Sequence, residues 1–253
     1  MKMNVRKGVK SAASMAMALV LIILTSCDQT EGYGGTSTIK GKIETMYYNS
    51  DYSILVRQEP AVDEEVFLLF GENEVVGDKV ESSATGAFEF SYLNPGTYKL
   101  YYTSEDSSRY NDSEYPVIVD IQLTEGEDLD LGTLQKIETL DFDDGSAKIY
   151  GVIQLINYKN TSEYPFLEVK DTSFAQEQEV YLIYNNHNYY DERIRTSYNG
   201  YFEFGNLIPG EYEVFTYSED VQGGTEDITI SKTITITEEN QEVDLGVIFI
   251  EQL

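Results

Sequence analysis

Apolar and polar residues alternate along most of the chain after residue 26. Phenylalanines flank a glutamate in residues 88–90 and again in 202–204, and a similar alternation runs through 117–123 and 243–249. A period of two is typical of strands that bury one face, and the abundance of Tyr, Thr, Ile and Val also favours strands. No long amphipathic helix is predicted in this part of the chain. We therefore predict an all-β protein whose antiparallel sheets pack face to face as sandwiches.

The same pattern occurs twice along the chain. Residues 85–106 reappear, with small changes, as residues 199–220. When 66–106 is aligned with 180–220, fourteen positions are identical, whereas average residue usage gives about two or three by chance. The chain therefore contains two copies of one unit.

Each copy has the length of an ordinary domain and is long enough to bury a core without disulfides. We predict the first sandwich over residues 38–137 and the second over 148–253. Residues 138–147 read ETLDFDDGSA. This acidic stretch with Gly and Ser predicts a short linker, which restricts how the two domains are oriented.

The first 26 residues predict a targeting signal. Four cations and no acid precede an uninterrupted apolar run at residues 15–24. A basic start followed by a short apolar core is typical of a secretory signal peptide, and the run is too short for a bilayer, which takes about 20 residues. The cations are Lys2, Arg6, Lys7 and Lys10.

The apolar run ends in Leu24-Thr25-Ser26-Cys27, which resembles the lipobox of bacterial lipoproteins. The resemblance implies cleavage before Cys27 and a diacylglyceryl group on its sulfur. Two acyl chains anchor a protein stably, whereas one does so only marginally. Residues 27–37 are polar and rich in glycine, so they are predicted to form a flexible, lipidated tether.

Two acidic residues, Asp28 and Glu31, follow the cysteine closely. Early acidic residues resemble a surface-export signal of lipoproteins in Bacteroidota-type bacteria. In enterobacteria, an Asp at this position instead resembles an inner-membrane retention signal. The predicted location is the bacterial cell envelope, with the outer membrane preferred, the cell surface as one alternative and the inner membrane as another.

The charge and the scarcity of Cys and His exclude several classes of function. Lys and Arg number 17 against 45 acids, a net charge of −28, and loss of the signal peptide makes it −32. Such a charge repels phosphate backbones, which argues against nucleic-acid binding. One Cys and one His exclude an intrachain disulfide and Cys-rich or multi-His metal sites. The single His187 is predicted to be a solvated hairpin residue rather than a general base.

Three carboxylates, Asp141, Asp143 and Asp144, precede Gly145. Clustered carboxylates suit Ca²⁺, but the spacing is one residue short of an EF-hand loop and Val152 stands at its twelfth position. We therefore predict an acidic linker, no metal and no cofactor, and leave a Ca²⁺ site at the junction as an open alternative.

Tyrosines gather at loops and strand ends, and Tyr189, Tyr190 and Tyr198 are the candidate ligand contacts. A rigid apolar ring with a polar tip suits sugar stacking and protein interfaces. The alternative is that Tyr simply fills strand positions in a chain without Trp. With acids everywhere and no large insertion to form a cleft, no catalytic residue is assigned and the protein is predicted not to be an enzyme.

The pattern Gly-x-Phe-x-Phe-x-x-Leu-x-Pro-Gly-x-Tyr with a later Asp-Leu-Gly occurs in both copies. It resembles the prealbumin-like (transthyretin-like) modules, which include carboxypeptidase regulatory-like and Cna B-type domains. The resemblance covers most of both copies and implies Greek-key sandwiches that serve as non-catalytic companions, stalks or spacers.

Cna B-type domains often carry an isopeptide bond between a first-strand Lys and a last-strand Asn or Asp, assisted by a Glu. Lys40 or Lys42 offers the amine in the first copy, but Tyr102 and Thr216 stand at the Glu positions. The bond is therefore not expected.

Taken together, the sequence predicts a lipid-anchored envelope protein with a structural, spacer or adhesion role. Its predicted partners are the membrane, through Cys27, and a surface protein or glycan. The alternative function is an accessory carbohydrate- or nutrient-binding surface lipoprotein.

Overall fold

The computed structural model describes residues 30–253 except 74, 106–113, 163–166 and 223–225. The predicted signal peptide and Cys27 lie outside the described residues, so cleavage and lipidation remain predictions. The regular elements of the described part are all strands. It contains no helix with the length and apolar character needed to cross a membrane.

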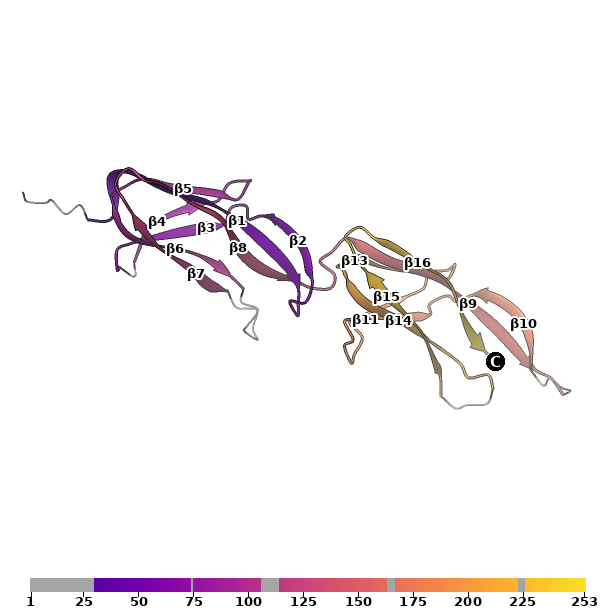
Figure 1. Ribbon diagram of the computed structural model, residues 1–253. Helices are drawn as coiled ribbons and strands as arrows, with labels where there is room; N and C mark the ends of the chain where they lie inside the picture. Colours follow the sequence, from indigo (N-terminus) through magenta and orange to yellow (C-terminus); the bar gives the residue numbers. More distant parts are fainter. Residues whose placement is uncertain (1–29, 74, 106–113, 163–166, 223–225) are drawn as a thin grey trace, which may run out of the picture.

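The eight strands of the first copy form two four-stranded sheets that face each other (Figure 1). One sheet is centred on β1, which pairs with β5 and β2 along one side and with β8 along the other. The second sheet has the order β4-β3-β6-β7. The bounds are β1 Tyr33–Asn49, β2 Leu55–Pro60, β3 Glu65–Phe70, β4 Val76–Glu81, β5 Ala87–Leu93, β6 Gly96–Ser104, β7 Tyr115–Leu123 and β8 Asp128–Leu140.

The second copy repeats this arrangement strand for strand. β9 is the centre of one sheet, with β13 and β10 on one side and β16 on the other, and the second sheet has the order β12-β11-β14-β15. The prediction of two all-β sandwiches is confirmed. The bounds are β9 Ala147–Asn160, β10 Leu167–Phe174, β11 Glu179–Tyr184, β12 Glu192–Arg195, β13 Tyr201–Leu207, β14 Gly210–Ser218, β15 Ile228–Ile236 and β16 Glu242–Gln252.

The last strand of each copy runs parallel to the first, which departs from the predicted antiparallel sheets, whereas the other strand pairings of the described residues are antiparallel as predicted. β8 pairs with β1 in parallel, and β16 pairs with β9 in the same sense. Parallel neighbours need a long connection, and here the remaining strands of the sandwich provide it. Because side chains alternate in both kinds of pairing, the hydrophobic pattern does not distinguish them.

The repeated Asp-Leu-Gly motif forms a bulge in this parallel pair. Gly132 and Gly246 have φ angles of +71° and +67°. The carboxylates of Asp130 and Asp244 accept the N–H groups of these glycines at 2.8 and 2.7 Å. The strand register shifts at the same positions. Since a left-handed φ favours glycine, the motif is explained by the fold and not by a ligand.

Each sandwich begins with a lead-in segment that is docked on its own sheets. In the first copy, the N–H of Asn94 donates to the carbonyl of Gly32 at 2.8 Å, and the N–H of Gly32 donates to the hydroxyl of Tyr98 at 3.1 Å. In the second copy, the N–H of Ile208 donates to the carbonyl of Phe142 at 3.0 Å. The lead-in segment is therefore part of the repeated unit.

This docking corrects the prediction of a flexible tether over residues 27–37. Strand β1 already begins at Tyr33, and the described residues 30–37 lie on the first sandwich. Gly35 makes the close approach: a Cβ there would lie 1.9 Å from the carbonyl oxygen of Leu93. At Gly35, therefore, the absence of a side chain serves close packing of the backbone rather than flexibility.

The region predicted as a linker, 138–147, is also largely structured. Strand β8 continues to Leu140 and β9 begins at Ala147. Gly145 repeats the role of Gly35 in the first copy, because a Cβ on Gly145 would lie 2.1 Å from the carbonyl oxygen of Leu207. The chain between the copies is therefore short and held against the second sandwich.

Each sandwich has a separate apolar core between its two sheets. The alternating phenylalanines point inward as the pattern predicts, and all four are at most 4% exposed. Tyr47 and Val56, from the first copy, pack against the core of the second. Residues of the first copy thus extend the packing around the second core at the junction. The four phenylalanines are Phe88, Phe90, Phe202 and Phe204.

Candidate functional site

The two copies act as controls for each other, because features present in both follow from the fold. The stacked rings of Tyr181 and Phe215 have centroids 4.8 Å apart and planes 10° apart. Phe67 and Tyr101 form the same stack in the first copy, at 4.7 Å and 8°. Cross-strand aromatic pairs of this kind stabilise a sheet. Groups found in one copy alone are better candidates for function.

The junction between the sandwiches is built around a buried asparagine. The side-chain amide of Asn49, which is fully buried at the end of β1, donates to the hydroxyl of Tyr184 on β11 at 3.1 Å. Its other atom, Oδ1, accepts the N–H of Ile54 at 2.9 Å. Burial raises the pKa of Tyr184, so its hydroxyl stays protonated. One side chain therefore fixes the turn after β1 and binds the second sandwich.

Two further contacts flank this bond. The amide of Asn185 donates to Asp51 at 2.5 Å, and Arg57 forms an ion pair with Glu239 at 3.2 Å. Burial alone would raise the pKa of Asp51, but hydrogen bonds, chiefly from Ser53 and then from Asn185, outweigh it and lower that pKa. These contacts hold the sandwiches end to end (Figure 1).

The outer face of the β11 sheet carries aromatic residues that the first copy lacks. Tyr190 and Tyr217 are 50% and 42% exposed, and their ring centroids lie 5.1 and 5.7 Å from that of Tyr181. The matched positions of the first copy hold Val76 and Thr103. We call Tyr181, Tyr190, Phe215 and Tyr217 the aromatic face.

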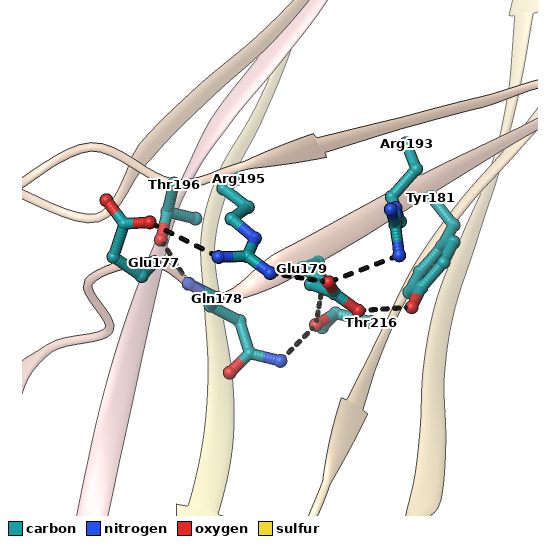
Figure 2. A network of polar contacts seen from close by, with 8 residues as sticks. All are labelled: Glu177, Gln178, Glu179, Tyr181, Arg193, Arg195, Thr196 and Thr216. Atoms are coloured by element: carbon teal, nitrogen blue, oxygen red, sulfur yellow. Dashed lines mark hydrogen bonds and ion pairs between the residues drawn. The ribbon is translucent and has the colours of Figure 1, made fainter.

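A polar network lies beside the aromatic face (Figure 2). One carboxylate oxygen of Glu179 accepts from Arg195 and Arg193 at 3.1 and 3.3 Å, and the other accepts the hydroxyl of Tyr181 at 2.6 Å. Residues two apart share a face of a strand, so β11 presents Glu179 beside Tyr181 and β12 presents both arginines next to them. Exposed rings beside charged donors and acceptors are the groups that orient a polar ligand.

Replacing Tyr181 by Phe is expected to raise the pKa of Glu179. The Tyr181 hydroxyl, and after it Arg195, holds that pKa below its ordinary value of 4.5. A lowered carboxyl pKa stabilises the fold above the ordinary value, and this contribution is lost as the pH falls through the lowered pKa. NMR titration of the Glu179 carboxyl carbon measures the change, with Phe215→Leu as a control that keeps the hydroxyl. An unchanged midpoint in Tyr181→Phe would contradict the assignment.

The structure separates the tyrosines that the sequence groups as ligand contacts. Tyr189 and Tyr190 lie in the turn between β11 and β12, whereas Tyr198 follows β12 at the opposite end of that hairpin. All three are at least half exposed. Tyr190 joins the aromatic face, while Tyr189 stacks on His187 with centroids 5.1 Å apart.

The other candidate residues make local contacts. Nδ1 of His187 lies 2.8 Å from Oδ1 of Asp191 within the same hairpin. The carboxylate of Asp144 accepts the N–H of Asp141 at 3.0 Å. Within the described ranges, no group of three or more His, Cys, Asp or Glu side chains is placed to hold a metal ion.

Reasoning from the sequence missed Glu179, both arginines and Tyr217. Their proximity depends on which residues of β11, β12 and β14 lie opposite one another, and turn geometry as well as the alternating pattern sets that register. A signal was nevertheless present in the alignment of the copies: Arg195 stands where the first copy has Glu81, and Tyr217 where it has Thr103.

No family model matches the sequence, and no curated protein matches it. Among solved structures, the Bacillus anthracis TIE protein is 12% identical with a TM-score of 0.28, over 85% of this chain and 35% of that one. The chain thus spans about a third of that protein's length. The minor pilin GBS52 of Streptococcus agalactiae is 11% identical with a TM-score of 0.28, over 86% and 97% of the two chains.

A third similar structure, PA1324 of Pseudomonas aeruginosa, is a protein suggested to bind carbohydrate. It is 13% identical with a TM-score of 0.25 and covers 44% of this chain and 90% of its own. At these TM-scores the similarities carry no inference about function.

Proposed function

We propose that the protein is a non-catalytic, lipid-anchored component of the cell envelope, in which the first sandwich is a spacer and the second carries the contact surfaces. The observation that carries the proposal is the junction at Asn49. Its buried amide is bonded within the first sandwich and to Tyr184 of the second. A junction of this kind holds the second sandwich at a fixed distance from the anchor, as a spacer requires.

The proposed anchor is the lipidated Cys27. The docked part of the chain begins close behind it, because the side-chain amide of Asn94 donates to the carbonyl of Thr30 at 2.9 Å. Three residues of chain can span at most about 10 Å. The proposal therefore places the first sandwich close to the bilayer, preferably at the outer membrane, and the second sandwich away from it.

Labelling with an alkyne fatty acid in the producing bacterium tests the anchor. The wild-type protein is expected to take up the label and fractionate with membranes, whereas Cys27→Ser should do neither. A label that persists in Cys27→Ser, or a wild-type protein that is soluble and unlabelled, would contradict the anchor. Protease added to intact cells then tests exposure: loss of the protein supports surface display, and protection opposes it.

The aromatic face favours a second candidate function, accessory carbohydrate binding. Tyrosine rings stack on sugars while neighbouring charged groups bind hydroxyls. In a glycan panel, binding should be lost in Tyr190→Val and Tyr217→Thr, which install first-copy residues. Tyr92→Ala, at a residue 74% exposed on the first sandwich, serves as the control. Unchanged binding in both test variants would refute this role.

A further inference from the structure

The outer face of the β9 sheet carries a second exposed patch that the function proposed above does not use. One cross-strand row contains Val247, Val152 and Tyr201, from β16, β9 and β13. The next row contains Phe249 and Phe174, which flank the polar Gln154 of β9. We call Tyr150, Val152, Phe174, Tyr201, Val247 and Phe249 the apolar face.

Three of these side chains are widely exposed. Val247, Phe249 and Phe174 are 43%, 51% and 49% exposed, and the rings of Tyr150 and Tyr201 lie 6.2 Å apart beside them. Apolar residues scattered singly on a surface need no explanation, but contiguous ones mark interaction sites. Here the apolar face extends over all four strands of the sheet.

The first copy shows that the fold does not require an apolar surface here. Its matched positions are polar or small, and the β1 sheet has a hollow of about 630 Å³ lined in part by Lys40, Lys42, Ala87 and Thr133. The same strands and pairings are present in both copies. The six matched residues of the first copy, in the order given above, are Lys40, Lys42, Pro60, Ala87, Thr133 and Gln135.

Carboxylates border the apolar face. Asp244 and Glu203 flank Tyr150 in the row at one end of the face, and Glu251 lies in the row beyond Phe249 at the other end. Among the described residues these three carboxylates form no ion pair, and the nearby Lys148 is already paired with Glu242 at 3.0 Å. The border is therefore negative.

We propose that the apolar face is a docking surface for a partner protein whose own apolar contact patch is bordered by lysine and arginine. The negative border selects such a partner, because charges of opposite sign steer association and like charges oppose it. A second copy of this chain does not fit. Two such borders would face each other, and each mature chain is expected to carry a net charge of −32. The proposal is independent of the lipid anchor and of sugar binding at the aromatic face.

Site-specific photo-crosslinking in the producing cells tests the proposal. A benzophenone amino acid replaces Phe249 in one strain and the matched Gln135 in another, with the full chain retained. We expect about tenfold more adduct from position 249, since a docking surface concentrates contacts. Mass spectrometry of the adduct should identify a partner segment with apolar residues flanked by lysine or arginine.

Two variants complete the test. Val152→Lys with Val247→Thr installs first-copy residues and should lower the adduct yield from position 249 by roughly tenfold. Glu251→Lys keeps the apolar residues and should lower the yield by roughly fivefold, because it reverses one border charge. Thermal unfolding confirms that both variants remain folded. Equal yields from positions 249 and 135, an adduct with a second copy, a contact segment without basic residues, or yields unchanged by the two variants would overturn the proposal.

Discussion

Replacing Gly200 by Ala should destabilise the second sandwich by about 3 kcal/mol or more, through two independent costs. Gly200 has a φ of +75°, a region that costs other residues roughly 1–2 kcal/mol. A Cβ there would also lie 2.3 Å from the carbonyl oxygen of Ile153. That carbonyl accepts the N–H of Ala175 at 3.0 Å, so moving it breaks a further contact. Urea unfolding followed by tyrosine fluorescence measures the loss.

Gly246→Ala is the matched control. Gly246 has a similar φ of +67°, but a Cβ there would meet no atom within 4 Å. Gly246→Ala should therefore lower the stability only through its backbone conformation, by about 1–2 kcal/mol. The first copy supplies a replicate, because Gly86 has a φ of +72° and its Cβ would lie 2.2 Å from the carbonyl oxygen of Ile43. Equal losses for Gly200→Ala and Gly246→Ala would show that the close approach to Ile153 does not matter.

Asn49→Ala should loosen the junction and lower the stability of the chain by about 2 kcal/mol, because buried partners lose their hydrogen bonds. The hydroxyl of Tyr184 loses a donor and the N–H of Ile54 loses its acceptor. Calorimetry should then resolve two thermal transitions, since the remaining contacts, Asn185 with Asp51 and Arg57 with Glu239, couple the sandwiches more weakly. The wild-type chain is expected to unfold in a single transition.

Tyr184→Phe separates the two roles of the asparagine. This variant removes the bond between the sandwiches but leaves the turn bond to Ile54 intact. It should split the thermal transition with a smaller loss of stability than Asn49→Ala. If both variants unfold in the same single transition as the wild type, Asn49 does not couple the sandwiches.

The strands and the duplication could be predicted because each depends on local pattern. Alternation put Phe88 and Phe90 in one core and their counterparts Phe202 and Phe204 in the other. The parallel pairing of β8 with β1 could not be predicted, because parallel and antiparallel strands share a period of two. The docking of residues 30–37 could not be predicted, because a glycine such as Gly35 can serve close packing as well as freedom of motion.

The candidate sites were harder to predict than the fold. Tyr190 was predicted from its exposed tyrosine-rich turn and lies on the aromatic face, but Glu179 and Arg195 come together through strand register. The role of Asn49 at the junction could not be predicted, because its partner Tyr184 is 135 residues away in the sequence. Contacts between distant residues depend on packing that a local pattern does not contain.

The central claim, that the junction holds the second sandwich in a fixed position relative to the first, is tested most directly by the distance between two spin labels. Ile118→Cys and Val169→Cys place labels on exposed strand positions of the first and second sandwich, 58% and 55% exposed, in the mature chain with Cys27→Ser. Pulsed dipolar spectroscopy should give one narrow distance distribution in the wild-type background and a broader one with Asn49→Ala. A broad distribution in both would show that the sandwiches move independently and would contradict the account.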